Sequence, residues 1–159
     1  MAYLIDGSNF LGYESAQNIR DPQSKYRLVA RLLRFQRQKK TRILIVFDGT
    51  ADPILVGEDF RRKSFSVIFP LWGENADDII KDIISKQTDL RRFFVVSSDR
   101  EIRSFARRKG AKLLNCKEFD RELKAALKKY RKYKEMMKKE PSLSPLEINQ
   151  WLKTFKDKK

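Results

Sequence analysis

The sequence predicts an α/β domain whose central sheet is mostly parallel and flanked by helices. Short apolar runs alternate with helical patterns from residue 3 to about residue 115, and such alternation is typical of parallel sheets. Aspartates follow several of these runs, where the carboxyl ends of strands line the ligand crevice of an open α/β sheet. With 159 residues, the chain suffices for one such domain and a short appendage.

The first half of the domain contains two strand patterns and one helix pattern. Residues 3–6 and 42–47 are short apolar runs, as expected of buried parallel strands. Residues 24–38 carry apolar side chains at helical spacing, namely Leu28, Leu32 and Phe35. We therefore expect the order strand, helix, strand.

The second half continues the alternation with three strands and two helices, at 65–69, 75–87, 93–98, 100–109 and 111–114. Pro70 ends the first of these strands, because proline cannot donate to a strand ladder. Gly110 separates the last helix from the last strand, as glycine commonly does after a helix. The predicted sheet therefore has five strands.

Beyond residue 117 the chain is expected to be helical and basic. Apolar residues recur at roughly helical spacing, at Leu123, Leu127, Tyr130 and Met137. From Asp120 to Lys159 there are thirteen lysines or arginines against six acidic residues. The expected division is an α/β domain over 1–118 and a basic helical extension over 119–159.

A last helix is expected over 145–155. Ser144 is a suitable N-cap, with proline at the first helical position and glutamate at the third. The C-terminal helices would either bind a polyanion through their basic residues or pack Trp151 and Phe155 onto the domain.

Composition narrows the possible functions. The net charge of +15 and pI near 10 favour a polyanionic partner, with nucleic acid first. The absence of histidine excludes Ser-His-Asp triads and histidine-ligated metals. Cys116, the only cysteine, is expected to pack as a small apolar residue. Neither a signal peptide nor an apolar run of membrane-spanning length is evident, so we expect a cytoplasmic protein with no membrane partner.

Two Asp-Gly pairs end predicted strands. Asp6 begins Asp6-Gly-Ser-Asn9, interpreted as a turn in which Ser8 and Asn9 orient the carboxylate; Asp48 follows the strand at 42–47. Each pair could also be an ordinary turn. If the strands are neighbours, both carboxylates lie in one crevice.

Four further carboxylates adjoin predicted helix starts. On the helix at 75–87, Asp77 lies at the edge of the isoleucine face and Asp78 points nearly opposite, so Asp77 is the expected inward ligand and Asp78 interacts with the helix dipole. Glu74 is either a ligand or a solvated loop residue. Ser98 or Asp99 would cap the helix at 100–109, and capping is compatible with metal binding.

Gathered carboxylates would repel one another unless a cation neutralised them. Oxygen ligands favour Mg²⁺ or Mn²⁺, which most often support phosphoryl transfer or phosphodiester hydrolysis. The nucleic-acid contacts would come from basic residues on two predicted helices, namely Arg100, Arg103, Arg107, Lys128 and Lys132.

These residues together resemble the NYN branch of the PIN-like nuclease superfamily, especially its YacP-like members. The ordered stretches are Leu4–Asn9, Val46–Gly49, Gly73–Asp78 and Val95–Arg100, followed by Gly110-Ala111. The resemblance covers roughly residues 1–120. Asp-Gly-Ser-Asn here departs mildly from the family's usual Asp-Gly-Tyr-Asn or Asp-Gly-Asn-Asn.

The resemblance implies a Rossmann-like PIN/NYN fold and a hydrolase that is an Mg²⁺- or Mn²⁺-dependent endoribonuclease. It assigns metal ligation to Asp6, Asp77 and Asp99, with Asp48 as a further ligand and Asn9 in support; Ser8, Glu74 and Ser98 would assist. The implied partner is RNA, whether mRNA, rRNA or tRNA, with the ribosome as a further expectation. We expect a monomer or weak homodimer.

Other functions remain open from the residues alone. The same fold could serve as an RNA-binding module with little or no catalysis, or as a DNA structure-specific nuclease. A phosphatase with an aspartyl nucleophile is disfavoured, because such enzymes usually carry Asp-x-Asp after the first strand and Asp6-Gly7-Ser8 lacks it.

Overall fold

Five parallel strands form the central sheet of the computed structural model, which describes residues 1–139. Their order across the sheet is β3-β2-β1-β4-β5. The strands are β1 (Ala2–Asp6), β2 (Arg42–Val46), β3 (Phe65–Ile68), β4 (Phe93–Val96) and β5 (Lys112–Leu114). The expected parallel α/β sheet is confirmed.

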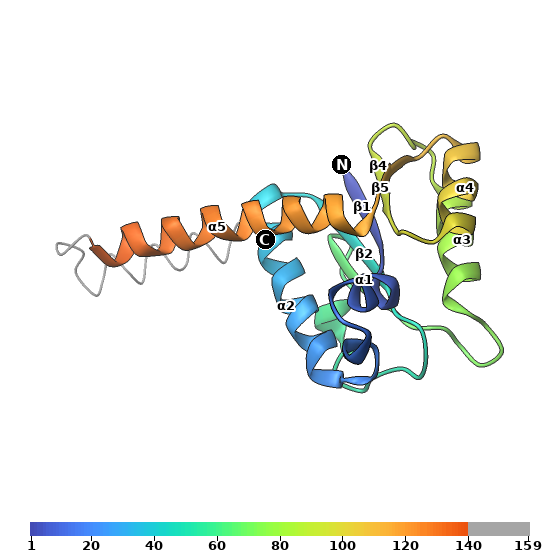
Figure 1. Cartoon of the computed structure of the whole chain (residues 1–159), viewed down its shortest axis with the longest axis horizontal. Helices are drawn as coiled ribbons and strands as arrows, with labels where there is room; N and C mark the ends of the chain where they lie inside the picture. Colours follow the sequence, from blue (N-terminus) through green and yellow to red (C-terminus); the bar gives the residue numbers. More distant parts are fainter. Residues whose placement is uncertain (140–159) are drawn as a thin grey trace.

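Helices cover both faces of this sheet (Figure 1). One layer contains α1, α2 and α5, and the other contains α3 and α4. The α-helices are α1 (Gly7–Glu14), α2 (Pro22–Lys39), α3 (Ala76–Lys86), α4 (Arg100–Lys109) and α5 (Cys116–Lys139). Two short 3₁₀ helices lie in connections: η1 (Ala16–Arg20) between α1 and α2, and η2 (Glu58–Phe60) between β2 and β3.

Strand β1 shows how the sheet divides the core. Tyr3 and Ile5 face the layer of α1, α2 and α5, whereas Leu4 faces α3 and α4. Successive side chains alternate between the two faces, and both faces are covered. This burial on both sides explains why the central strands are almost continuously apolar rather than alternating.

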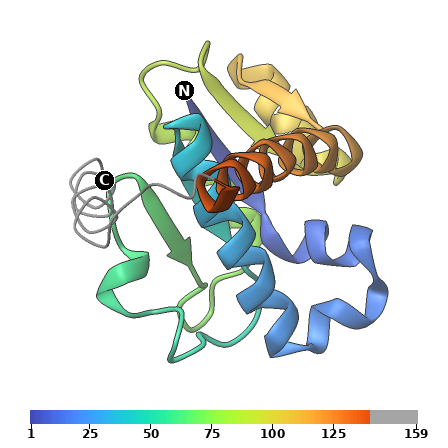
Figure 2. The same ribbon diagram turned by 90° about the vertical axis from the view of Figure 1, so that its left-hand side faces the viewer.

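The first half of α5 is part of the core. Phe119 and Leu123 are fully buried, and the Phe119 ring lies edge-on to Phe10 and Phe35 with ring centroids 5.7 and 5.4 Å away. Figure 2 shows α5 lying across α2, and Figure 1 shows its far end extending beyond the sheet. The expected boundary after residue 118 falls inside this helix.

The interpretation of Asp6–Asn9 as a turn is wrong. The segment begins α1, and Asp6 is the N-cap whose carboxylate accepts a hydrogen bond from the Asn9 N–H at 3.4 Å. An aspartate before small polar residues suits a helix start as well as a turn, because it satisfies free N–H groups in both.

The expected helix over 145–155, including Ser144, Trp151 and Phe155, lies outside the described residues. Among the helices of residues 1–139, none combines the length and apolar character needed to cross a membrane.

Candidate functional site

The strand order places a topological switch point between β1 and β4. From β1 the chain builds β2 and β3 on one side, then crosses to form β4 and β5 on the other. Asp6 is the last residue of β1, and Asp99 follows the end of β4. Ligands of open α/β sheets bind at the carboxyl ends of strands beside such a switch point.

Asp6 is the most buried of the predicted acidic residues, with 6% of its surface exposed. Its carboxylate accepts hydrogen bonds from the Asn9 N–H and, at 3.1 Å, from the Ser97 hydroxyl. Burial raises the pKa of Asp6 to about 6; the charges of Asp77 and Asp99 also raise it, and the two hydrogen bonds lower it. A proton therefore leaves this carboxyl near neutral pH.

Asp99 is linked to Asp6 through Ser97. The Asp99 N–H donates to the Ser97 hydroxyl oxygen at 3.1 Å, and that hydroxyl donates to Asp6. The Asp99 carboxylate caps α4 by accepting from the N–H groups of Glu101 and Ile102 at 2.9 and 3.1 Å. Asp99, rather than Ser98, is therefore the helix cap.

Ser97 was not predicted from the sequence to be a site residue, whereas Ser98 was expected to support the metal ligands. Ser97 is completely buried and joins the Asp6 carboxylate to the Asp99 backbone N–H, whereas the Ser98 side chain accepts from the Cys116 N–H at 3.2 Å. The two serines are adjacent on a chain leaving a strand, so they point in different directions. Two consecutive polar residues after the apolar run were the available signal.

Asn9 connects three elements around the site. Its side-chain oxygen accepts from the Ser98 N–H at 2.9 Å and from the Cys116 thiol at 3.1 Å. Cys116 is fully buried, as expected, and burial raises the pKa of its thiol. Asn9 thus fixes the start of α1 against the end of β4 and the start of α5.

Asp77 faces the other carboxylates from the first turn of α3. It is partly buried, whereas Asp78 is exposed, in agreement with the prediction from helical geometry. The pKa of Asp77 is raised by desolvation and then by the negative charges of Asp99, Glu101 and Asp48, while Lys81 lowers it. The helix cap here is Asn75, which accepts from the Asp78 N–H at 2.9 Å.

Asp48 is exposed just beyond β2. Its N–H donates to the Ser8 hydroxyl oxygen at 2.9 Å, which ties the β2 end to the start of α1. Glu74 is also exposed, and its carboxylate accepts from the Leu71 N–H at 3.2 Å. The described contact of Glu74 therefore lies within its own loop.

The four aspartates offer only oxygen donors, which suits Mg²⁺ or Mn²⁺. The charges of Asp77 and Asp99 raise the pKa of Asp6, and the charges of Asp99 and Asp48 raise the pKa of Asp77. Within residues 1–139, however, no three acidic, cysteine or histidine side chains converge closely enough to be a ready-made metal site. The donor chemistry of the four aspartates fits such an ion.

The predicted basic residues have different surroundings. The Arg103 guanidinium donates to the Ser97 carbonyl at 3.0 Å and so holds α4 against the segment that follows β4. Arg100 and Arg107 are exposed on α4, and Lys128 and Lys132 are exposed on α5.

Two lysines near the carboxyl edge were missed from the sequence. Lys81 pairs with Glu101 and lies in the charge environment of Asp77. Lys25 lies over the Phe47 and Phe69 rings, with its ammonium nitrogen 5.7 and 5.9 Å from their centroids. Nothing in the helical spacing around Lys25 or Lys81 indicated that either lysine would lie near the site.

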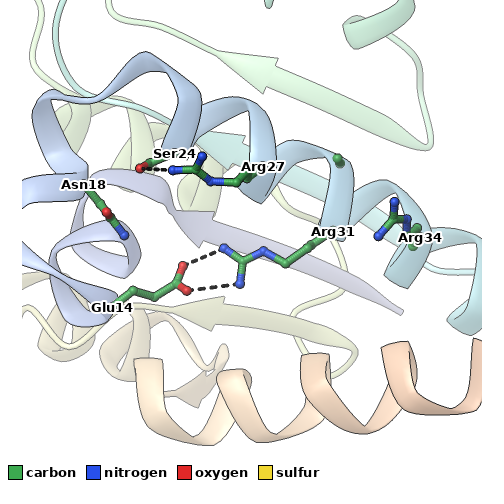
Figure 3. A pocket seen from close by; sticks show the side chains of 7 residues that line it. Glu14, Asn18, Ser24, Arg27, Arg31 and Arg34 are labelled. Atoms are coloured by element: carbon green, nitrogen blue, oxygen red, sulfur yellow. Dashed lines mark hydrogen bonds and ion pairs between the residues drawn. The ribbon is translucent and has the colours of Figure 1, made fainter. Parts of the chain in front are cut away.

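A separate hollow of about 450 Å³ lies beside α2 (Figure 3). In it, Arg31 forms a two-point ion pair with Glu14, at 2.8 and 3.1 Å. None of the four aspartates is among its lining residues, which are Glu14, Asn18, Ser24, Arg27, Ala30, Arg31 and Arg34.

Comparison with known proteins identifies the family and the fold. The family model of the YacP-like NYN domain matches residues 3–157. A crystal structure of Rae1 (YacP) from Bacillus subtilis superposes with a TM-score of 0.68 and 22% identity, covering 98% of this chain and 92% of the other. Its W164L mutant gives 0.73 and 19%, covering 91% and 87%. No curated protein sequence matches this chain.

Proposed function

The chain belongs to the YacP-like NYN domain family and has a nuclease-type fold, and from this premise we propose that it is a metal-dependent endoribonuclease acting at the carboxyl edge of the sheet. The observation that carries the proposal is the buried Asp6 carboxyl, whose pKa is raised to about 6 by burial and by the charges of Asp77 and Asp99. Perturbed carboxyls gathered at a strand edge are typical of catalytic sites.

Asp6, Asp77 and Asp99 would hold Mg²⁺ or Mn²⁺, with Asp48 completing the set. When bound, such an ion supplies Lewis-acid stabilisation of the scissile phosphate and an activated water. Ser97 and Asn9 orient the strand ends that carry the ligands. Asp6 releases its proton near neutral pH, so protons compete with the ion below about pH 6.

The net charge supports a nucleic acid as the substrate class, and the family membership favours RNA. A chain with a charge of +15 attracts a phosphate backbone, whereas the aspartate cluster on its own would repel one. Arg100, Arg107, Lys128 and Lys132 are exposed cations available for this contact. The substrate approach is therefore assigned to basic residues outside the aspartate cluster.

The decisive experiment measures cleavage of labelled single-stranded RNA and sequence-matched DNA with Mn²⁺, Mg²⁺ or EDTA. We expect RNA cleavage that needs the metal and is lost in Asp6→Asn and Asp77→Asn. Asp78→Asn is the matched control, because this neighbouring aspartate is exposed on the outer face of α3. Equal cleavage by wild type and Asp6→Asn would refute the assignment.

Metal binding can be read separately from activity. We expect Mn²⁺ to raise the melting temperature of the wild type, because a ligand that binds only the folded state stabilises it. The shift should be smaller in Asp6→Asn and unchanged in Asp78→Asn.

A non-catalytic RNA-binding module is the second candidate. The observation favouring it is that the carboxylates of residues 1–139 do not already converge as a three-ligand set. Binding of RNA without cleavage under every metal condition, and without a thermal shift by Mn²⁺, would support this alternative.

A further inference from the structure

Trp72 is the most exposed large apolar side chain among the described residues. Its side chain is fully exposed, and the neighbouring Leu71 is 73% exposed. Tryptophan is highly buried on average in folded proteins. An exposed tryptophan beside an exposed leucine therefore suggests a surface that binds something apolar and flat.

The chain holds this tryptophan at the tip of an ordered turn. The Glu74 N–H donates to the Leu71 carbonyl at 3.0 Å, and the Glu74 carboxylate accepts from the Leu71 N–H at 3.2 Å. Gly73 has a φ of +84°, as the third residue of a type II turn requires. Glu74, expected to be a ligand or a solvated residue, thus closes the turn that presents Trp72.

This turn lies beside the aspartate cluster. It connects the carboxyl end of β3 to the start of α3, where Asp77 lies, and Figure 1 shows the connection looping outward there. Asp77 is five positions after Trp72, so even a fully extended chain would keep their Cα atoms within about 18 Å. That distance corresponds to a few nucleotides of an extended strand.

A cation accompanies the aromatic side chain. The Lys25 ammonium lies 5.9 Å from the ring centroid of Phe69, three residues before Trp72. Proteins that bind single-stranded nucleic acid combine cations for the backbone with aromatic side chains on which bases stack. Lys25, which lies over Phe69, and Trp72, three residues further along the chain, supply one of each.

Resting on the proposed function, we propose that Trp72 is a stacking platform for an unpaired nucleobase of the RNA, with Lys25 contacting the adjoining phosphate. A base inside a duplex has both faces covered by its neighbours, so along a strand only an unpaired base can stack on Trp72. The subsite therefore selects single-stranded over double-stranded RNA close to the cleavage site.

The test measures affinity in EDTA, where binding is separated from metal-dependent cleavage. A fluorescein-labelled 12-nucleotide oligouridylate and a blunt RNA duplex are titrated with the full chain and followed by fluorescence anisotropy. We expect Trp72→Ala to bind the single strand about five- to 150-fold more weakly, the range for losing one stacked base. Affinity for the duplex should change less than twofold.

Two controls make the result specific. Trp72→Phe keeps an aromatic face and should restore most of the affinity. Ile54→Ala removes another exposed apolar side chain, 62% exposed on a different loop, and should leave affinity unchanged. Equal losses in Ile54→Ala and Trp72→Ala, or wild-type affinity in Trp72→Ala, would overturn the proposal.

A direct signal comes from the fluorescence of Trp72 itself. The chain has two tryptophans, so a Trp151→Phe variant leaves Trp72 as the only one. Quenching by oligouridylate and not by the duplex is expected for a stacked base. Unchanged emission with bound single strand would contradict stacking.

The failure of this proposal differs from the failure of the nuclease proposal. Cleavage by wild type together with unaltered binding by Trp72→Ala removes the stacking site and leaves the nuclease. A loss of single-strand affinity in Trp72→Ala, with no cleavage under any condition, leaves the stacking site and removes the nuclease.

Discussion

The surroundings of Asp6 disfavour its ionisation in two ways. Its position at the end of a central strand buries it, and two other carboxylates add negative charge nearby. Both effects disfavour ionisation, which is why the pKa of Asp6 is raised to about 6. At neutral pH the folded chain therefore carries a charged group that the unfolded chain accommodates more easily.

Replacing Asp6 with asparagine should stabilise the fold while removing activity. The difference between a folded pKa of about 6 and an ordinary value of 3.8 corresponds to at most about 3 kcal/mol of destabilisation at pH 7. The asparagine side chain keeps one acceptor for the Ser97 or Asn9 hydrogen bond. We expect the free energy of unfolding in urea to rise by about 1–3 kcal/mol at pH 7.

The difference in unfolding free energy between wild type and Asp6→Asn should disappear at acidic pH. Between pH 4 and 6 the folded state binds the Asp6 proton more tightly than the unfolded state, so the contribution of Asp6 to stability falls as the pH rises through that window. Below about pH 4 the carboxyl is neutral in both states. A stability difference between wild type and Asp6→Asn that is unchanged from pH 3.5 to pH 7 would contradict this assignment.

At the scale of elements, helix starts build the site. The N-caps of α1, α3 and α4 are Asp6, Asn75 and Asp99, and the N-termini of these helices lie at the carboxyl edge of the sheet. The partial positive charge of a helix N-terminus stabilises nearby anions. Three such ends therefore offset part of the repulsion among the clustered carboxylates.

The capping role of Asp99 should be separable from its proposed role in metal ligation. Asp99→Ala removes the acceptor for two N–H groups of α4 and should cost about 1 kcal/mol of unfolding free energy. Asp99→Asn keeps a capping oxygen and should cost much less. Urea denaturation of both variants measures this, and cleavage assays should show both inactive. Full activity in Asp99→Asn would limit this residue to capping.

The packing of α1 against β2 depends on the absence of a side chain at Gly7. A Cβ at this position would lie 2.7 Å from two ring atoms of Phe47 and 3.0 Å from Cγ1 of Ile45. We expect Gly7→Ala to lower the unfolding free energy by about 1–3 kcal/mol, the usual cost of overpacking.

Gly57→Ala is the control for this prediction. A Cβ there would meet only the Ile54 carbonyl oxygen at 3.8 Å, an ordinary contact, so the change should be near neutral or slightly stabilising. Similar unfolding midpoints for the two variants would show that Gly7 is not required by packing.

At the scale of the whole molecule, the clustered acidic residues and the exposed lysines of α5 lie in different places. The acidic cluster lies at one edge of the sheet, whereas exposed lysines of α5 lie on a helix that extends away from it. A strand of RNA attracted by the basic surface would thus reach a locally negative edge, where a divalent cation can neutralise both carboxylates and phosphate.

Salt dependence tests whether α5 contacts the backbone. Replacing Lys128 and Lys132 together by glutamine should reduce the slope of log affinity against log salt by about 1.4, because each phosphate contact on a single strand contributes about 0.7. Lys86→Gln is the control, since this lysine pairs with Asp82 on α3 at 2.8 Å. An unchanged slope in the double variant would remove these two lysines from the interface.

The sequence was sufficient for the parallel sheet and for much of the helical layer. Apolar runs without alternation predicted buried strands, because parallel strands covered on both faces lose contact with water. Helical geometry also distinguished Asp77 from Asp78, since the two differ by about 100° around one helix. It did not reveal that Asp6 begins a helix, because the same small polar residues favour turns and helix starts.

By itself, the sequence determined what is local or periodic: the buried strands, the family motifs and the excess of positive charge. The tertiary structure alone decided which groups meet across long separations in the chain. Ser97 bridges Asp6 and Asp99, Asn9 holds Ser98 and Cys116, and a closed turn presents Trp72. Such contacts depend on strand order and side-chain direction, which periodicity along one element does not encode.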